Sequence, residues 1–321
     1  MNQVFSQMCR ETTRWGYIIP SSKENKDIIE PAKEELFNDE NFFTKTSNKK
    51  SKHKAKKAEA SAGPAYQGAT VIEACTGLYY GPIATLDFAS LYPSIMIAYN
   101  LSYETLVKDR TMVAGLVQPE ASSSNTSSMQ SRNRFKGCLK MDEVHIFNKN
   151  QPSEAIFLKK DPNTGNIGFL PSILNNLLAA RKAAKREMAQ TKDPVQKRIL
   201  NGRQLALKIS CNSIYGFCGA LAGYLPCIPI AATVTFIGRG LIDKTKYIVE
   251  NHYTLSHGYE GNAKVVYGDT DSVMIKFAVP HEKGPNAVAR AFELAKDAAE
   301  RVTSVFPSPV KLEFEKVYRY I

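Results

Sequence analysis

The segment from residue 264 to residue 277 constrains the fold most strongly. Lys264-Val-Val-Tyr-Gly and Ser272-Val-Met-Ile-Lys-Phe277 are β-rich runs on either side of Asp269-Thr-Asp271. Two such runs joined by a tight turn predict an antiparallel hairpin. The turn crowds two carboxylates, which repel each other unless a cation lies beside them. Magnesium suits this arrangement, because it takes one or two carboxylates and completes its shell with water or phosphate. Asp is also a common turn residue, so ordinary turn chemistry is the alternative.

A second acidic residue stands at the end of another apolar run. Asp87 closes Ile83-Ala-Thr-Leu86 and is followed by Phe-Ala-Ser-Leu-Tyr-Pro-Ser94. A carboxylate at the end of a buried strand is costly without a partner. The turn after it exposes the amides of Ser90 and Leu91 before a helix that starts at Pro93, and such amides can hold phosphate oxygens. An ordinary helix cap is the alternative.

Two long helices are predicted over residues 170–190 and 194–215, with Thr191-Lys-Asp-Pro194 as the break between them. A connection this short makes them an antiparallel pair. Helical spacing places Arg181 and Lys185 on one face of the first helix, and Lys208, Asn212 and Tyr215 on one face of the second. From Arg181 to Lys208 there are nine basic residues and two acidic ones. These cations would bind a polyphosphate if they face the carboxylates; a solvated basic face is the alternative.

The overall charge also favours a polyanionic partner. The formal net charge is +11 and the isoelectric point is near 9.2, which makes nucleic acid the first candidate. No run approaches the roughly 20 apolar residues needed to span a membrane, and the first ten residues lack a secretory signal pattern. We therefore expect a soluble intracellular protein. The six cysteines show no C-x-x-C spacing, which predicts free thiols, several of them buried.

Other segments differ in character. Residues 1–20 predict a short amphipathic helix with Val4, Phe5, Met8 and Cys9 on one face. Residues 21–65 are lysine-rich and predict a flexible insertion, with a phosphate-binding arm as the alternative reading. Residues 115–137 contain a Ser/Asn-rich surface loop. A strand over residues 70–72, helices over 232–251 and 286–305, and a strand over 312–317 complete the expected elements.

Three of these segments together resemble a known family. Asp87-Phe-Ala-Ser-Leu-Tyr-Pro-Ser94, Lys208-Ile-Ser-Cys-Asn-Ser-Ile-Tyr-Gly216 and Tyr267-Gly-Asp-Thr-Asp-Ser272 are similar to motifs A, B and C of family B DNA polymerases, in that family's order. The surrounding sequence resembles the eukaryotic delta-type enzymes and their relatives in large DNA viruses. The resemblance covers most of residues 66–321. It implies a DNA-directed DNA polymerase, a nucleotidyltransferase that adds deoxynucleoside triphosphates to a primer 3′ end in DNA replication by two-metal-ion phosphoryl transfer.

The resemblance also implies a role for each motif residue. Asp87 and Asp271 would be the main ligands of two Mg²⁺ ions, with the Phe88 carbonyl assisting and Asp269 supporting them. Tyr92 would pack under the incoming sugar and exclude a 2′-hydroxyl. The other nucleotide-binding residues would be Ser90, Leu91, Arg181, Lys185, Lys208, Asn212 and Tyr215.

The implied DNA contacts lie in two further motifs. Tyr66-Gln-Gly-Ala69 resembles the Y-x-G-G element near the template, with Ala in place of its second Gly, which assigns DNA binding to Tyr66 and Gly68. Thr235-Phe-Ile-Gly-Arg239 matches the T-x-x-G-R pattern of the primer–template, through Thr235, Gly238 and Arg239. Glu313 and Glu315 are candidates for an extra acidic ligand, with an ordinary surface strand as the alternative.

The expected fold is α+β, a palm of antiparallel strands backed by helices that carries a helical fingers hairpin. Residues 66–169 and 218–321 would form the palm, and residues 170–217 the fingers. No Asp-x-Glu exonuclease motif precedes motif A, and no thumb follows, so we expect a fragment with weak nucleotide binding and little processive activity.

Partners implied by the resemblance are primer–template DNA, a nucleotide and a sliding-clamp processivity factor, with no membrane, in the nucleus or at a viral replication site. Two rival classes of protein remain. One is a non-catalytic nucleic-acid-binding scaffold that keeps the fold. The other is a reverse transcriptase, which would carry an aromatic-x-Asp-Asp turn instead of Asp269-Thr-Asp271 and would lack the Lys208–Tyr215 pattern.

Overall fold

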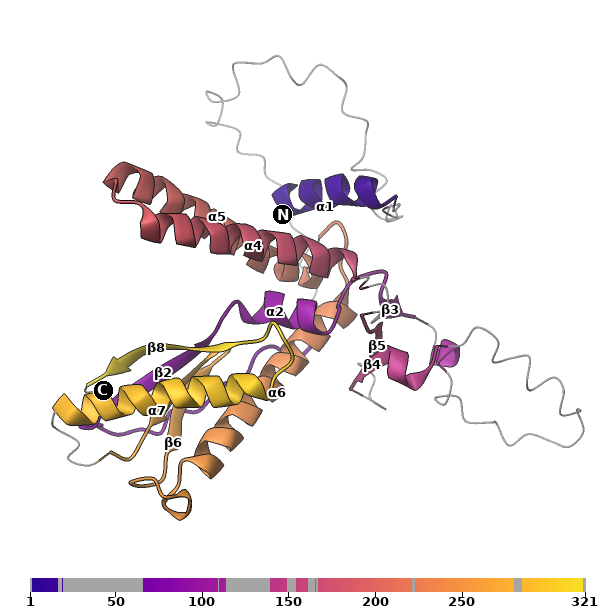
Figure 1. Ribbon diagram of the computed structural model, residues 1–321. Coiled ribbons are helices and arrows are strands. Elements are labelled where there is room, and N and C mark those ends of the chain that lie inside the picture. Colours follow the sequence, from indigo (N-terminus) through magenta and orange to yellow (C-terminus); the bar gives the residue numbers. More distant parts are fainter. Residues whose placement is uncertain are drawn as a thin grey trace, which may run out of the picture.

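A five-stranded antiparallel sheet forms the centre of the computed structural model (Figure 1). The structure describes residues 2–16, 19, 66–108, 110–113, 139–148, 154–160, 165, 167–220, 223–279 and 285–319. The strand order is β1-β6-β7-β2-β8. The strands are β1 (Val71–Ile72), β2 (Ile83–Phe88), β6 (Lys264–Asp269), β7 (Ser272–Lys276) and β8 (Leu312–Tyr318). The predicted hairpin is confirmed as β6 and β7, which pair antiparallel.

One face of this sheet is covered by helices. α6 (Ile228–His252) contacts β6 and β7, α7 (Pro285–Ser304) contacts β2 and β8, and the two helices touch each other. Along β7, Val273 and Ile275 are fully buried, whereas the alternating residues are half-buried. This period of two shows that the opposite face of the sheet is more open. α6 begins four residues before the predicted Ala232, because Ile230 and Ala231 are buried in the core.

The predicted helical pair consists of α4 (Phe169–Gln190) and α5 (Pro194–Gly219). Asp193 caps α5, since its carboxylate accepts from the amides of Val195 (2.9 Å) and Gln196 (3.4 Å). The hairpin projects away from the sheet in Figure 1. α5 continues past the predicted end at Tyr215, because Phe217 and Cys218 pack into the core.

A second, three-stranded sheet was not predicted. It has the order β3-β5-β4, with β3 (Leu106–Val107), β4 (Val144–Phe147) and β5 (Ala155–Leu158). Two short 3-10 helices, η3 (Arg110–Met112) and η4 (Met141–Glu143), adjoin it. Each strand is only two to four residues long, so alternation within any one of them carries little signal.

Two more helices complete the arrangement. α2 (Leu91–Ala98) lies between β2 and the helical pair, and nearly all of it is buried. α1 (Asn2–Trp15) packs beside the end of α5, where the Phe5 ring stacks on Tyr224 at 4.7 Å. α1 ends before Gly16, which has a φ of 70° that favours glycine. The predictions for residues 21–65 and 115–137 lie outside the described residues.

The predicted α+β class is confirmed, since helices and antiparallel sheets both contribute to one core. Cys211, Cys218 and Cys227 are buried free thiols, as expected, and Cys9 and Cys75 are half-buried free thiols. In the part of the chain that the structure describes, no helix has the length and apolar character to cross a membrane.

Candidate active site

Strand pairing brings the two predicted metal-binding acids together. Asp87 at the end of β2 pairs with Ser272 at the start of β7, in the centre of the sheet. The Phe88 amide donates to the Asp271 carbonyl over 2.8 Å. Thr270, in the turn of the hairpin, has a φ of 51°, a conformation that a residue with a side chain adopts only when its surroundings hold it there. The Asp87 and Asp271 side chains therefore line one cavity.

The electrostatics of this pair disfavour two free charges. Partial burial, followed by repulsion from Asp271, raises the pKa of Asp87 to about 6. Burial is also the main cause that raises the pKa of Asp271, and Asp269 adds to it. The positive charge of Lys208, which lines the same cavity, lowers the pKa of both acids and so opposes these shifts. A divalent cation would relieve the remaining repulsion.

The donor set fits magnesium. Two half-buried carboxylates and the carbonyl of Phe88 offer hard oxygen ligands, and magnesium takes the rest of its shell from water and phosphate. Among the described residues no group of three or more His, Cys, Asp or Glu side chains could hold a metal ion by itself.

A cavity of about 440 Å³ joins the acids to the helical pair. It contains most of the predicted catalytic and nucleotide-binding residues, contributed by β2, α2, α4, α5 and the hairpin turn. Its lining is Asp87, Phe88, Ala89, Ser90, Leu91, Tyr92, Arg181, Lys185, Lys208, Asn212, Tyr215, Thr270, Asp271 and Glu313.

Arg181 connects α4 to the turn after β2. Its Nη1 donates to Ser90 Oγ at 3.0 Å, and its Nε to Gln204 Oε1 at 3.5 Å. Ser90 itself has a φ of 51°, so the turn is held in a conformation of higher energy beside the cavity. Gln204 is a residue that the sequence reasoning missed. Its spacing of four from Lys208 places it on the same face of α5, and that spacing could have identified it.

Two tyrosines, Tyr92 and Tyr215, line the cavity, and a third, Tyr66, lies behind them. The Tyr92 and Tyr215 rings lie 4.4 Å apart at an angle of 50°. The Tyr215 hydroxyl is 3.3 Å from that of Tyr66. Burial and then the nearby Asp271 raise the pKa of Tyr92. The Tyr92 hydroxyl is therefore held in its neutral form beside the acids.

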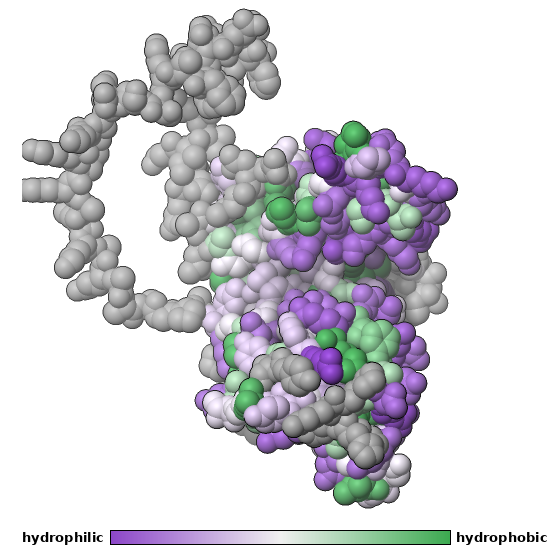
Figure 2. All heavy atoms as spheres, turned by 90° about the vertical axis from the view of Figure 1, so that its left-hand side faces the viewer, coloured by the Kyte–Doolittle hydropathy of each residue, from purple (hydrophilic) through white to green (hydrophobic). Residues whose placement is uncertain are grey.

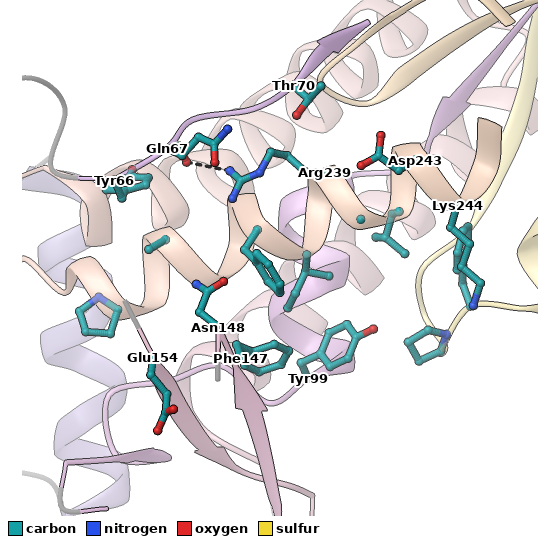
Figure 3. Close-up of a pocket in the computed structure, with 18 of the residues that line it drawn as sticks. Tyr66, Gln67, Thr70, Tyr99, Phe147, Asn148, Glu154, Arg239, Asp243 and Lys244 are labelled. Atoms are coloured by element: carbon teal, nitrogen blue, oxygen red, sulfur yellow. Dashed lines mark hydrogen bonds between the residues drawn. The ribbon is translucent and has the colours of Figure 1, made fainter. Parts of the chain in front are cut away.

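The segment from Tyr66 to Gly68 is fastened to α6 (Figure 3). Arg239 Nη1 donates to the carbonyls of Gln67 at 2.9 Å and Gly68 at 2.6 Å. Thr235 Oγ1 donates to the Gln67 carbonyl at 2.9 Å. Thr235 and Gly238, two of the predicted DNA contacts, are buried, and Gly238 lies next to Tyr92 and Leu91. The Thr235 hydroxyl is directed to the Gln67 carbonyl, and DNA binding by the two residues stays a prediction.

A larger open groove of about 1120 Å³ runs along α6 beyond this segment. Tyr66, Tyr99 and Arg239 extend into it from three different parts of the chain (Figure 3). The exposed Phe236 ring lies 5.9 Å from the Arg239 guanidinium, and the Phe306 ring lies 5.8 Å from Lys244 Nζ. Aromatic rings beside cations are typical of surfaces that bind single-stranded nucleic acid.

Two predicted acids stay at the margin. Asp269 is exposed and does not line the cavity, and its Oδ1 accepts from Thr270 Oγ1 at 2.8 Å. Glu315 does not line it either, although its charge raises the pKa of Asp87. Glu313 does line the cavity and also pairs with Lys311 at 2.9 Å. Glu313 thus lines the cavity, whereas Glu315 has the larger effect on the pKa of Asp87 and also raises that of Asp271, so both glutamates stay candidates.

Comparison with known proteins places the chain in a family. The family model described as DNA polymerase family B matches residues 1–321. DNA polymerase delta catalytic subunits are similar over most of the chain: that of Mesocricetus auratus is 50% identical over 260 residues, covering 81% of the chain and 20% of the relative. That of Drosophila melanogaster is 48% identical over 253 residues (79% and 20%), and that of Glycine max 47% over 264 residues (82% and 21%). The chain thus spans about one fifth of the length of these relatives. The chain belongs to DNA polymerase family B.

Proposed function

We propose that this chain carries out the nucleotidyl-transfer step of template-directed DNA synthesis. In this proposal it adds deoxynucleoside triphosphates to a primer 3′ end. The five-stranded sheet with α6 and α7 is the palm, from residues 66–169 and 218–321, and α4 with α5 is the fingers, residues 170–217. The observation that carries the proposal is the convergence of Asp87 and Asp271 with Arg181, Lys185 and Lys208 around one cavity.

The chemistry requires positioning and charge neutralisation more than covalent help from the protein. Two bound magnesium ions would supply activation of the primer hydroxyl and stabilisation of the leaving pyrophosphate. Asp87, Asp271 and the Phe88 carbonyl would hold these ions, with Asp269 supporting them from outside the cavity. Arg181, Lys185, Lys208 and Asn212 would bind the triphosphate, with the amides of Ser90 and Leu91 at its other side. The hydrophilic surface of the α4–α5 hairpin, at the top of Figure 2, is consistent with a hairpin that closes over a charged ligand.

The base and the sugar would meet the tyrosine wall. The Tyr92 ring would pack below the sugar and leave no room for a 2′-hydroxyl, and Tyr215 would line the pocket of the new base pair. Tyr66 and Gly68 would lie near the template, with Arg239 holding their segment in place. The groove along α6 would then receive the unpaired template strand, because Tyr66, which lines the groove, contacts Tyr215, which lines the active-site cavity.

Single-nucleotide incorporation into a primed template is the decisive test. Incorporation that requires Mg²⁺ and is lost in Asp271→Asn supports the proposal. DNA binding without incorporation would instead support the rival, a scaffold that keeps the fold without the chemistry. A sliding-clamp partner and a nuclear or viral replication site stay predictions.

A further inference from the structure

Helix α4 begins without a cap of its own. Its N-cap residue is Gly168, which has no side chain, and its first turn contains no acidic residue. The first amides of any α-helix have no acceptor within the helix. A buried helix start must therefore find acceptors elsewhere.

A segment that follows α2 supplies these acceptors. Asn100 Oδ1 accepts from the Gly168 amide at 2.7 Å, and Ser102 Oγ accepts from the Leu170 amide at 3.1 Å. The Glu104 Oε1 atom accepts from the Phe169 amide between them. Three successive amides are thus satisfied by three side chains from one distant segment, and the Glu104 charge also suits the positive end of the helix dipole.

The three side chains are held in place themselves. Ser102 Oγ donates to Glu104 Oε2 at 2.6 Å, and Asn100 Nδ2 donates to the Leu158 carbonyl at 3.1 Å. Asn100 and Ser102 are buried, and Asn100 has a φ of 56°. The contact is also close: a Cβ on Gly168 would lie 2.8 Å from that of Ser102. We call Asn100, Ser102 and Glu104 the base clamp.

The base clamp joins two elements of the candidate site. The clamp segment follows α2, which bears Leu91 and Tyr92, whereas α4 bears Arg181 and Lys185. Arg181 lies 12 residues beyond Phe169, or about 18 Å along the helix axis. A tilt of about 5° at the helix base would move its guanidinium by about 1.5 Å. Shifts of about 1 Å in a binding group can lower a rate on the order of 100-fold.

We propose that the base clamp is a set of positioning residues that fixes the pivot of the α4–α5 hairpin and so sets where Arg181 and Lys185 meet the triphosphate. The inference rests on the proposed function, because it assumes that these cations bind a nucleotide. None of the three clamp side chains lines the candidate active-site cavity. They act through α4.

The experiment compares two helix caps of the same hairpin. Glu104→Ala removes an acceptor at the base, whereas Asp193→Ala removes the cap of α5 at the far end and serves as the matched control. Both residues are exposed, so both variants should fold. Glu104→Gln keeps an acceptor oxygen for Phe169 and tests rescue. Arg181→Ala reports whether the hairpin cations bind nucleotide at all.

Two measurements test the base clamp and the proposed nucleotide binding separately. Spin labels at Lys197→Cys and Glu300→Cys, with Cys9, Cys75 and Cys138 replaced by serine, report the distance from the hairpin tip to α7 without any nucleotide. Binding of a Mg²⁺–deoxyadenosine triphosphate complex to the 321-residue chain reports affinity. We expect Glu104→Ala to broaden the distance distribution and to weaken nucleotide affinity about tenfold. Asp193→Ala should leave both the distribution and the affinity unchanged. Glu104→Gln should largely restore both.

Each outcome has a fixed meaning. A distribution in Glu104→Ala as narrow as that of the parent, or equal broadening in Asp193→Ala, overturns the clamp. Broadening with unchanged nucleotide affinity, while Arg181→Ala weakens binding, overturns its positioning role. Unchanged affinity in Arg181→Ala would instead contradict the proposed function, whatever the spin labels report.

Discussion

The Phe88 amide donates to the Asp271 carbonyl over 2.8 Å, and this bond holds the Asp87 and Asp271 side chains at one end of the sheet. Asp87 belongs to β2, whereas Asp271 lies in the turn just before β7, so no single strand contains both acids. Antiparallel pairing of β2 with β7 is therefore what creates the acidic site.

Asp271→Asn should abolish magnesium-dependent nucleotide incorporation. The amide cannot carry the negative charge that a metal ligand needs here, and loss of several kcal/mol of transition-state stabilisation corresponds to about a 1000-fold lower rate. Single-turnover incorporation measures this. The melting temperature without metal serves as the control and should not fall, because the substitution removes a repelling charge. Incorporation near the parental rate would remove Asp271 from the ligand set.

Magnesium affinity should fall as the pH is lowered through about 6. Asp87 has a pKa raised to about 6, mainly by burial, and only its ionised form binds a cation. Titration of magnesium binding between pH 5 and pH 8, monitored by calorimetry, checks this, since both limits bracket the value of about 6. Affinity that stays constant across pH 6 would contradict the assignment of Asp87.

The same raised pKa makes a prediction about stability without metal. An acid whose pKa is higher in the folded state stabilises the fold below its unfolded value of 3.8, and this contribution is lost as the pH rises through about 6. Asp87→Asn should therefore raise the free energy of unfolding at pH 8 and have a smaller effect at pH 4. Denaturant unfolding at both pH values measures the difference. If Asp87→Asn increased the free energy of unfolding more at pH 4 than at pH 8, burial would not disfavour the ionised form of Asp87.

Tyr92→Ala should admit ribonucleotides. Removal of the ring opens space below the sugar for a 2′-hydroxyl. A small group gained or lost in a binding pocket typically changes the discrimination between two substrates about 10- to 100-fold. Competing incorporation of a ribonucleotide and its deoxy counterpart measures the ratio. Tyr92→Phe keeps the ring that packs on Tyr215 and should keep the discrimination. Unchanged selectivity in the alanine variant would exclude the gate role.

Arg239→Gln should weaken primer–template binding about tenfold with little change in its salt dependence. The Nη1 atom of Arg239 donates to the Gln67 and Gly68 carbonyls, so its loss frees the Tyr66 segment. Thr235→Val removes the neighbouring bond to Gln67 without a change of charge and should act in the same direction. Anisotropy titrations at several salt concentrations measure both. A salt slope lowered by about 1 would instead indicate a direct phosphate contact.

Much of the local structure follows from the sequence. The spacing of apolar residues predicted α4, α5 and α7, and the turn between two β-rich runs predicted β6 and β7. Asp193 before Pro194 marked the start of α5, because its side chain satisfies amides that the helix cannot. These signals are readable because the interactions behind them join residues that are close in the chain.

Other features depend on contacts between distant residues. No pattern in β3, β4 or β5 indicated that they pair with each other, since each is only two to four residues long. The burial of Thr235 and Gly238 and the contact of Gln204 with Arg181 likewise depend on how α5 and α6 pack.

The sequence by itself determined the main helices and the β6–β7 hairpin, and it marked the acids and the cations of the candidate site, because period, caps and turns act within a few residues. Only the tertiary structure decided that β2 lies between β7 and β8, that Arg181 meets the turn after β2, and that Asn100, Ser102 and Glu104 cap a helix far along the chain. The physical reason is that burial and the demand for hydrogen-bond partners are satisfied across the whole core, where residues distant in sequence supply what a local segment lacks.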